Sequence, residues 1–150
     1  MADALWSDEA GVPMLALAAD CVPILLAAPG AVGAAHAGWR GTAKNVAGAA
    51  VAALARLGAR PSAMRAWLGP SIGPCCYEVG PEVSGLFDRD LTREGNLDLW
   101  SASERALTGA GVASVERLDL CTRCHPEEFF SHRYSGPRRG AQGVIGAVAG

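Results

Sequence analysis

Three apolar runs in the first quarter of the chain predict strands. They are Val12–Ala19, Val22–Leu26 and Ala31–His36, with Asp20-Cys21 between the first two and Pro29-Gly30 between the last two. Short apolar runs bounded by turn residues are typical of buried strands. The first run leads straight through Asp20-Cys21 into the second, so we expect a continuing strand there. A tight turn at residues 28–31 would pair the second run with the third.

The hydrophobic period becomes helical after Lys44. Apolar residues recur at spacings of three and four, at Val46, Ala50, Leu54 and Leu57. Thr42 is a suitable N-cap, and Gly58 followed by Pro61 stops the pattern. The sequence therefore predicts a helix from about Lys44 to Leu57.

Shorter patterns predict the remaining elements. We expect strands at Met64–Leu68, Val112–Leu120 and Gly143–Val148, a helix at Ser101–Gly109, and an irregular loop at Gly69–Pro74. With 150 residues, half of them apolar, the chain is long enough for one domain with a core and too short for two large ones. We expect a single domain over residues 1–150.

Charge and composition narrow the function classes. The net charge of −2 and the lack of any Lys/Arg run argue against nucleic-acid binding, which needs clustered positive charge. The longest apolar stretch, Met14–Ala37, is interrupted by Asp20, Pro23 and Pro29, so it is a poor membrane span. No secretory signal is visible, and five cysteines, an odd number, favour free thiols or metal ligands. We expect a cytoplasmic protein.

Candidate chemistry is concentrated at Ala34–Thr42. His36 follows a predicted strand, and Gly38 and Gly41 let the backbone turn tightly and approach a ligand closely. Arg40 would lie at the mouth of the following helix, whose N-terminal amides favour an anion. The natural guest of this arrangement is phosphate.

Cys21 and His36 form the second candidate site. Pairing across the turn at 28–31 would place them near the same end of a sheet. A thiolate with an imidazole suits zinc, and a Cys-His pair is equally the start of a nucleophilic hydrolase site. Each residue alone is as readily a buried core side chain. A catalytic zinc needs a third protein ligand from elsewhere.

Four further cysteines have less specific surroundings. Cys121-Thr122-Arg123-Cys124-His125 matches the haem-attachment pattern, but that chemistry is usual in exported proteins and we do not favour it. Cys75 and Cys76 are adjacent, which does not suit two strand side chains that converge on one ion. We interpret them as loop or core thiols.

Four motifs together resemble the laccase-domain family. They are Ala19–Leu26 with its A-D-C sequence, His36–Gly41 (H-A-G-W-R-G), Leu68–Pro74 with Tyr77–Gly80, and Cys121-Thr122 with Phe129–Arg133. They occur in the family's order over nearly the whole chain. That family was long labelled polyphenol oxidase or multicopper oxidoreductase and is now associated with purine nucleoside phosphorolysis.

The resemblance implies an α+β fold, a layered α/β/β/α-type single domain of mixed sheets flanked by helices. It also implies that Cys21 and His36 bind zinc. The expected activity is a zinc-dependent purine nucleoside phosphorylase that cleaves adenosine or inosine with phosphate, with adenosine deamination at the same site. Its partners would be a nucleoside and phosphate, with Cys21, His36 and Arg40 as catalytic residues.

The chain departs from the family at both ends. The family has an additional N-terminal region whose histidine completes the zinc site, so His125, His132 or a second chain would have to replace that ligand here. The family's arginine-containing tail is replaced by Arg133–Gly140. We expect an open edge strand or an exposed apolar patch where the N-terminal region would pair, and hence a homo-oligomer or a poorly soluble chain.

Three other functions compete with the phosphorylase. A copper-dependent polyphenol oxidoreductase fits the old family label, but three histidines are too few for a multinuclear copper cluster. A Cys-His hydrolase such as an amidase, and an inactive remnant that binds without turnover, stay open. Metal analysis separates them: zinc favours the phosphorylase, copper the oxidoreductase, and no metal the other two.

Overall fold

The structure is a computed structural model that describes residues 3–150. Its strands are β1 (Ala4–Ser7), β2 (Met14–Ala18), β3 (Val22–Ala28), β4 (Ala31–Ala37), β5 (Arg65–Leu68), β6 (Thr92–Arg93), β7 (Asn96–Leu97), β8 (Ser114–Arg117) and β9 (Gln142–Gly146). Its helices are α1 (Trp39–Ala43), α2 (Val46–Arg56), α3 (Pro81–Ser84), α4 (Leu99–Gly109) and α5 (His132–Ser135), with 3₁₀ turns η1 (Pro61–Ala63) and η2 (Arg89–Leu91).

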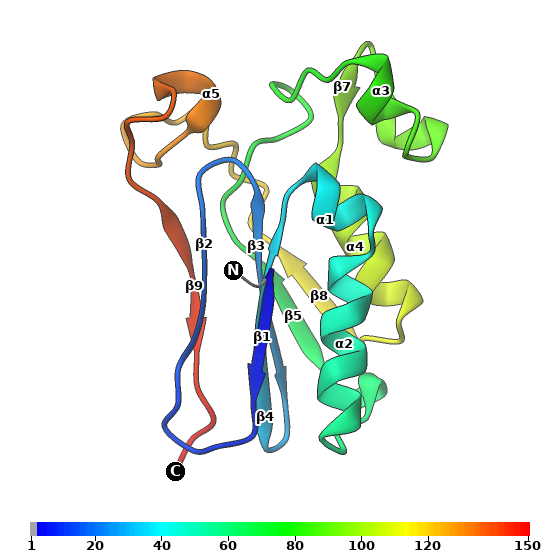
Figure 1. Ribbon diagram of the computed structural model, residues 1–150, viewed down its shortest axis with the longest axis vertical. Helices are drawn as coiled ribbons and strands as arrows, with labels where there is room; N and C mark the ends of the chain where they lie inside the picture. Colours follow the sequence, from blue (N-terminus) through cyan, green and yellow to red (C-terminus); the bar gives the residue numbers. More distant parts are fainter. Residues whose placement is uncertain (1–2) are drawn as a thin grey trace.

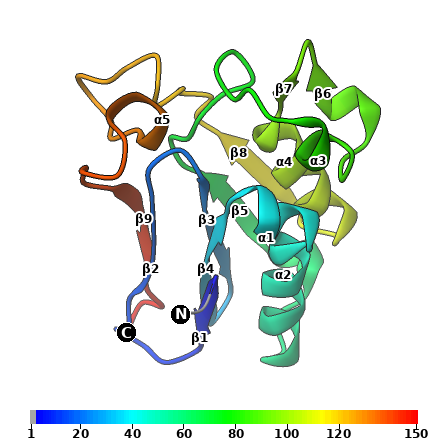
Figure 2. The ribbon, with the colours of Figure 1, turned by 45° about the horizontal axis from the view of Figure 1, so that its top comes forward.

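A mixed five-stranded sheet forms the centre of the molecule. Its strand order is β1-β4-β3-β5-β8, in which only β5 and β8 pair in parallel. Helices α2 and α4 cover one face of this sheet, and the two-stranded ribbon β2-β9 lies over the other (Figures 1 and 2). The predicted α+β fold with mixed sheets and flanking helices is confirmed.

The β3-β4 hairpin forms as predicted. Gly30 has a φ of 74°, a conformation that glycine adopts without steric cost, and it closes the turn between the two strands. The antiparallel register places Pro23 opposite His36. Cys21 immediately precedes β3, so both candidate residues come to the same end of the sheet.

The continuing strand expected through Asp20-Cys21 does not form. Asp20 has a φ of 92°, which breaks the extended path, and β2 pairs with β9 whereas β3 enters the central sheet. Residues 19–21 are therefore a corner between two sheets. A run of apolar side chains could not reveal this, because both strands are apolar.

The helix predicted to begin near Lys44 after a Thr42 cap is divided. α1 begins at Trp39 with Gly38 as its N-cap, and the Thr42 hydroxyl donates to the carbonyl of Gly38 at 2.9 Å rather than capping a helix. Asn45, with a φ of 58°, caps α2 instead by accepting from the amide of Gly48. Asparagine tolerates this left-handed conformation better than most residues, so the chain changes direction at Asn45.

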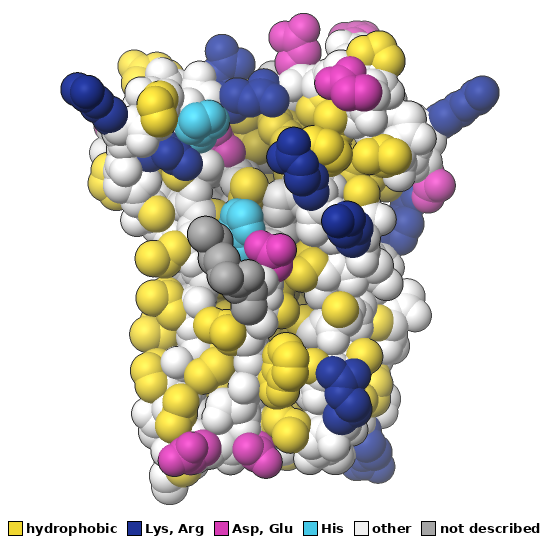
Figure 3. All heavy atoms as spheres, in the orientation of Figure 1, with side chains coloured by type: hydrophobic (Ala, Val, Ile, Leu, Met, Phe, Trp, Pro, Cys, Tyr) yellow, Lys and Arg dark blue, Asp and Glu magenta, His cyan; other side chains and the backbone are white. Residues whose placement is uncertain are grey.

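The core lies between the central sheet and the helices. Ile24, Leu26 and Leu68 from the sheet and Leu54 from α2 are almost fully buried. On the opposite side, hydrophobic side chains gather over the β2-β9 ribbon and remain visible at the surface (Figure 3). In residues 3–150, no helix is both long enough and apolar enough to cross a membrane.

Candidate active site

One cavity brings the three sequence-predicted site residues together. It has a volume of about 310 Å³ and is lined by Asp3, Cys21, His36, Gly38, Trp39, Arg40 and Gly41. The corner after β2 supplies Cys21, the end of β4 supplies His36, and the first turn of α1 supplies Arg40. Residues nearly twenty positions apart therefore line one small cavity at the open end of the β3-β4 hairpin, opposite its turn.

Gly38 allows the close approach of Cys21. A Cβ at this position would lie 2.8 Å from Sγ of Cys21 and 3.8 Å from Cε1 of His36. The first distance is shorter than real Cβ contacts, so a larger residue would displace the thiol. The Cys21 thiol therefore occupies space beside the main chain that only glycine leaves open.

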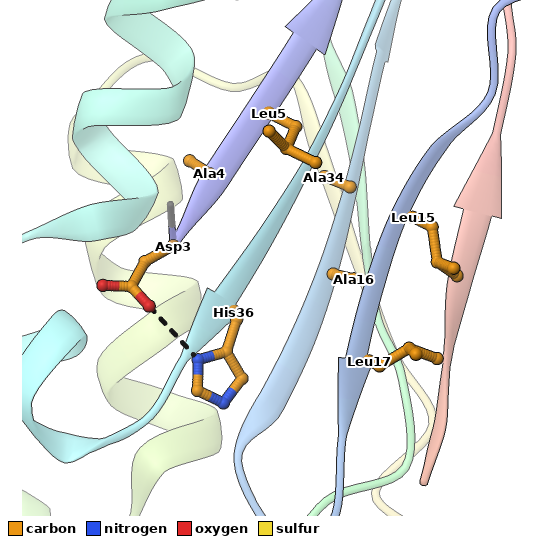
Figure 4. A pocket seen from close by; sticks show the side chains of 8 residues that line it. All are labelled: Asp3, Ala4, Leu5, Leu15, Ala16, Leu17, Ala34 and His36. Carbon is orange, nitrogen blue, oxygen red and sulfur yellow. Dashed lines mark ion pairs between the residues drawn. The ribbon is translucent and has the colours of Figure 1, made fainter. Parts of the chain in front are cut away.

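Asp3 lies beside the His36 imidazole. Its Oδ1 is 3.6 Å from Nδ1 of His36, and the other ring nitrogen points away from the carboxylate (Figure 4). The backbone amide of His36 also donates to the carbonyl of Asp3 at 2.8 Å. A carboxylate near one imidazole nitrogen favours the proton on that nitrogen and leaves Nε2 free to bind a metal. Sequence reasoning did not identify Asp3.

The environment of Cys21 does not favour a free nucleophilic thiolate. Burial, followed by the negative charge of Asp20, raises the pKa of the Cys21 thiol, and the charge of Arg139 opposes that rise. Cysteine nucleophiles of hydrolases need a lowered pKa. Because the pKa of Cys21 is raised, its environment is unfavourable for a Cys-His hydrolase, which needs a thiolate without a metal. In a metal site, the ion itself would hold the sulfur as a thiolate.

Asp20, the neighbour of Cys21 in the chain, forms hydrogen bonds to two segments that are distant in sequence. Its Oδ1 accepts a hydrogen bond from the Thr122 hydroxyl at 2.7 Å, and its Oδ2 accepts one from the backbone amide of Arg133 at 2.7 Å. Asp20 is 5% exposed and has a positive φ. Strained residues that their surroundings hold in place cluster at functional sites. The sequence analysis did not identify this role of Asp20, although an acidic residue inside an apolar run is a signal that could have revealed it.

Arginines from separate elements lie near the candidate site, beside the carboxylates of Asp3 and Asp20. The Arg133 guanidinium donates to the carbonyl of Glu78 at 2.9 Å and stacks over the ring of Tyr77. Burial, with the nearby thiol of Cys21, raises the pKa of the Tyr77 hydroxyl, while the charges of Arg133 and Arg40 oppose that rise. Arg40 itself stacks on Trp39, with its Cζ 4.2 Å from the ring centroid.

The expected contribution of a long helix N-terminus to the anion site is not present. Arg40 belongs to the five-residue helix α1, and the longer helix α2 begins beyond it with its amide of Gly48 already capped by Asn45. Positive charge near the cavity therefore comes from guanidinium groups rather than from a helix dipole.

The candidate metal ligands divide into separate groups. Within residues 3–150, no third histidine, cysteine or acidic side chain completes a set with Cys21 and His36. His125 lies near Glu127 and Glu128 instead, and neither it nor the exposed His132 lines the cavity. Elsewhere a group of four cysteines could hold a metal: Cys75, Cys76, Cys121 and Cys124.

A family model described as "Multi-copper polyphenol oxidoreductase laccase" matches residues 1–148. The chain belongs to this family. The sequence is 41% identical over 147 residues to a protein of Xylella fastidiosa named purine nucleoside phosphorylase, a match that covers 88% of this chain and 55% of that protein.

Two further family members extend the comparison. The crystal structure of YlmD from Geobacillus stearothermophilus superposes with a TM-score of 0.88 at 39% identity, over 97% of this chain and 61% of that one. A protein of an unknown prokaryotic organism named adenosine deaminase RL5 is 36% identical, over 92% of this chain and 58% of that protein. The chain thus spans between half and two thirds of the length of these relatives.

Proposed function

We propose that this chain is the laccase-domain part of a zinc-dependent purine nucleoside phosphorylase that converts adenosine or inosine and phosphate to the free base and ribose 1-phosphate. The observation that carries the proposal is the shared cavity of Cys21, His36 and Arg40. The names of the family members at about 40% identity support the reaction class. The free state of all five cysteines suits a reducing cytoplasm.

Zinc fits the donors in this cavity. A thiolate from Cys21 and Nε2 of His36 are ligand types that zinc binds, with Asp3 placed to orient the imidazole. These two side chains would hold the ion together with a further ligand from outside the described residues. Zinc bound there would supply a Lewis acid.

The arginines suit the phosphate substrate. In phosphorolysis an oxygen of phosphate forms a bond to C1′ of the ribose, and the bond from C1′ to the base breaks with its electron pair leaving on the base. The charge of Arg40 would hold and orient the phosphate, while Arg133 adds positive potential beside Tyr77. Adenosine deamination, which uses water instead of phosphate, is a second reaction we propose for the same cavity, supported by the name of one relative.

The test compares two histidines in similar surroundings. Nδ1 of His36 lies 3.6 Å from Asp3, and Nδ1 of His125 lies 3.7 Å from Glu127, with side-chain exposures of 40% and 42%. Only His36 lines the cavity. Base release from inosine is measured with and without phosphate, using zinc-replete protein.

Loss of a residue that only supports a metal ligand typically costs about 10- to 100-fold, so we expect His36→Ala, which removes a ligand, to reduce phosphate-dependent release by at least about 10-fold. We expect His125→Ala to leave it within about twofold. Release that does not depend on phosphate, or equal activity of both variants and wild type, would contradict the proposed function.

A further inference from the structure

Four cysteines from two separate loops meet outside the candidate active site. Cys75 and Cys76 lie in the loop after β5, and Cys121 and Cys124 lie in the loop after β8. Their sulfur atoms all lie within 4.8 Å of one another. None of the four residues lines the cavity that contains Cys21.

The sulfur separations match the edge of a metal-centred tetrahedron. Sγ of Cys124 is 3.7 Å from Sγ of Cys75 and 3.5 Å from Sγ of Cys76. Four sulfurs bound to one zinc at about 2.3 Å would be separated by about 3.8 Å at ideal tetrahedral angles. A disulfide would need a sulfur separation of about 2.05 Å. The arrangement is therefore close to that of four ligands around one ion.

Turns hold the sulfurs in these positions. The amides of Cys124 and His125 both donate to the carbonyl of Cys121, which folds the C-x-x-C sequence into a tight turn. The amides of Cys76 and Tyr77 both donate to the carbonyl of Gly73. Because Cys75 and Cys76 lie in this turn and not in a strand, adjacent side chains can reach the same point. Cys75 and Cys76 are loop thiols, as interpreted from the sequence, but the argument from strand geometry against their sharing one ion does not apply to a turn.

One sulfur is already supported as an anion would be. The backbone amide of Gly73 donates to Sγ of Cys121 at 3.3 Å, from the opposite loop. Hydrogen bonds of this kind favour a charged thiolate, the form that binds metals. The guanidinium of Arg123 lies nearby and donates to the carbonyl of Cys76, so a positive charge accompanies the cluster.

We propose that Cys75, Cys76, Cys121 and Cys124 bind a single structural zinc ion. Four thiolates fill all the positions of a tetrahedral ion, so this centre has no open position for substrate. It is distinct from the site of Cys21 and His36, for which no third ligand lies close enough among residues 3–150.

The ion would hold together two loops whose residues contact neighbours of the candidate active site. The first loop carries Tyr77 and Glu78, which contact the Arg133 side chain. The second carries Thr122, which donates to Asp20 beside Cys21. Backbone hydrogen bonds from Ser71 to Leu120 and from Thr122 to Ser71 join the main chains of these loops near their start. An ion coordinated by all four cysteines would hold the following parts of the two loops together.

Metal content of matched variants tests the proposal. Zinc is measured by mass spectrometry in protein prepared with a reductant and excess zinc and then freed of unbound metal. In a Cys21→Ser background, zinc that remains must lie outside the Cys21 site. We expect that protein to retain one equivalent of zinc per chain, and the double variant Cys21→Ser/Cys124→Ser to lose it.

Cobalt binding gives a second measurement that needs no substitution of the four cysteines, so it does not depend on whether such a variant folds. We expect Co²⁺ added to metal-free Cys21→Ser protein to show the intense visible absorption and thiolate charge-transfer bands of a tetrahedral tetrathiolate site, and zinc to abolish them. Three results would overturn the proposal: Cys21→Ser protein without zinc, a disulfide among the four cysteines in freshly reduced protein, or iron in place of zinc.

Discussion

At the scale of single residues, the candidate site depends on a glycine that leaves space for a neighbouring thiol as well as on the side chains that line the cavity. Gly38 gives the Cys21 thiol its place beside His36, and Asp3 holds one side of the imidazole. Arg40 reaches the same cavity from α1 while its guanidinium stacks on Trp39. Stacking restricts the arginine before any anion arrives, so less side-chain entropy is lost on binding.

Arg40 is the residue whose substitution tests the phosphate contact. A charge-assisted contact of this kind contributes about 1.5–3 kcal/mol, so Arg40→Ala should raise the phosphate concentration needed for half-maximal rate by roughly 10- to 150-fold. Arg40→Lys should recover only part of the loss, because an ammonium lacks the planar fork. Initial rates against phosphate concentration, with inosine as substrate, measure both effects.

Arg56 supplies the matched control for this experiment. It is an exposed arginine in the last turn of α2 and does not line the cavity, so Arg56→Ala makes the same change in net charge without touching the site. Adenosine deamination, which uses no phosphate, should change little in either variant. A phosphate dependence of Arg40→Ala equal to that of wild type would make Arg40 a structural residue of α1.

At the scale of elements, local pattern predicted what local sequence determines. Apolar runs and Pro29-Gly30 predicted the β3-β4 hairpin, because its turn and pairing involve neighbours in sequence. The start of α2 was misplaced because Asn45 adopts a left-handed conformation that no periodicity reveals. The meeting of Cys75 with Cys124 could not be predicted either, since it depends on how β5 and β8 pair in the central sheet.

The corner between β2 and β3 should depend on the Asp20 carboxylate. Asp20→Ala would leave the Thr122 hydroxyl and the Arg133 amide without their acceptor and would place alanine at a φ of 92°. We expect a loss of about 3 kcal/mol or more in the free energy of unfolding, measured by urea denaturation. Asp20→Asn is the control: it keeps the shape and one oxygen acceptor and should lose clearly less. Equal stability of wild type and Asp20→Ala would show that the corner forms without these bonds.

At the scale of the whole molecule, the central sheet is covered by helices on one face and by a thin ribbon on the other. The outward side chains of that ribbon are apolar: Leu15, Leu17 and Ile145 are 44%, 55% and 63% exposed. Leu5 and Trp6 on β1, the edge strand of the central sheet, are also exposed. A groove of about 230 Å³ lies between these surfaces, with His36 at one end (Figure 4). Strand β1 is therefore an edge strand with exposed apolar side chains, and the ribbon adds a second exposed apolar surface.

We expect concentrated protein to self-associate through these exposed apolar side chains, with the ribbon of one copy against the ribbon or β1 of another. Burying a leucine or isoleucine side chain contributes about 1.5–3 kcal/mol, so Leu17→Lys/Ile145→Lys should weaken the association by at least about tenfold. Both side chains point away from the core, so the monomer should stay folded. Leu86→Lys changes an equally exposed leucine, 56% exposed, which follows α3 on the other side of the molecule from the ribbon (Figure 1), and should associate as wild type does. Light scattering over a concentration series measures the mass of all three proteins. Because exposed strand edges and apolar faces together drive such contacts, wild-type protein that stays monomeric at high concentration would show that this surface does not bind a second copy.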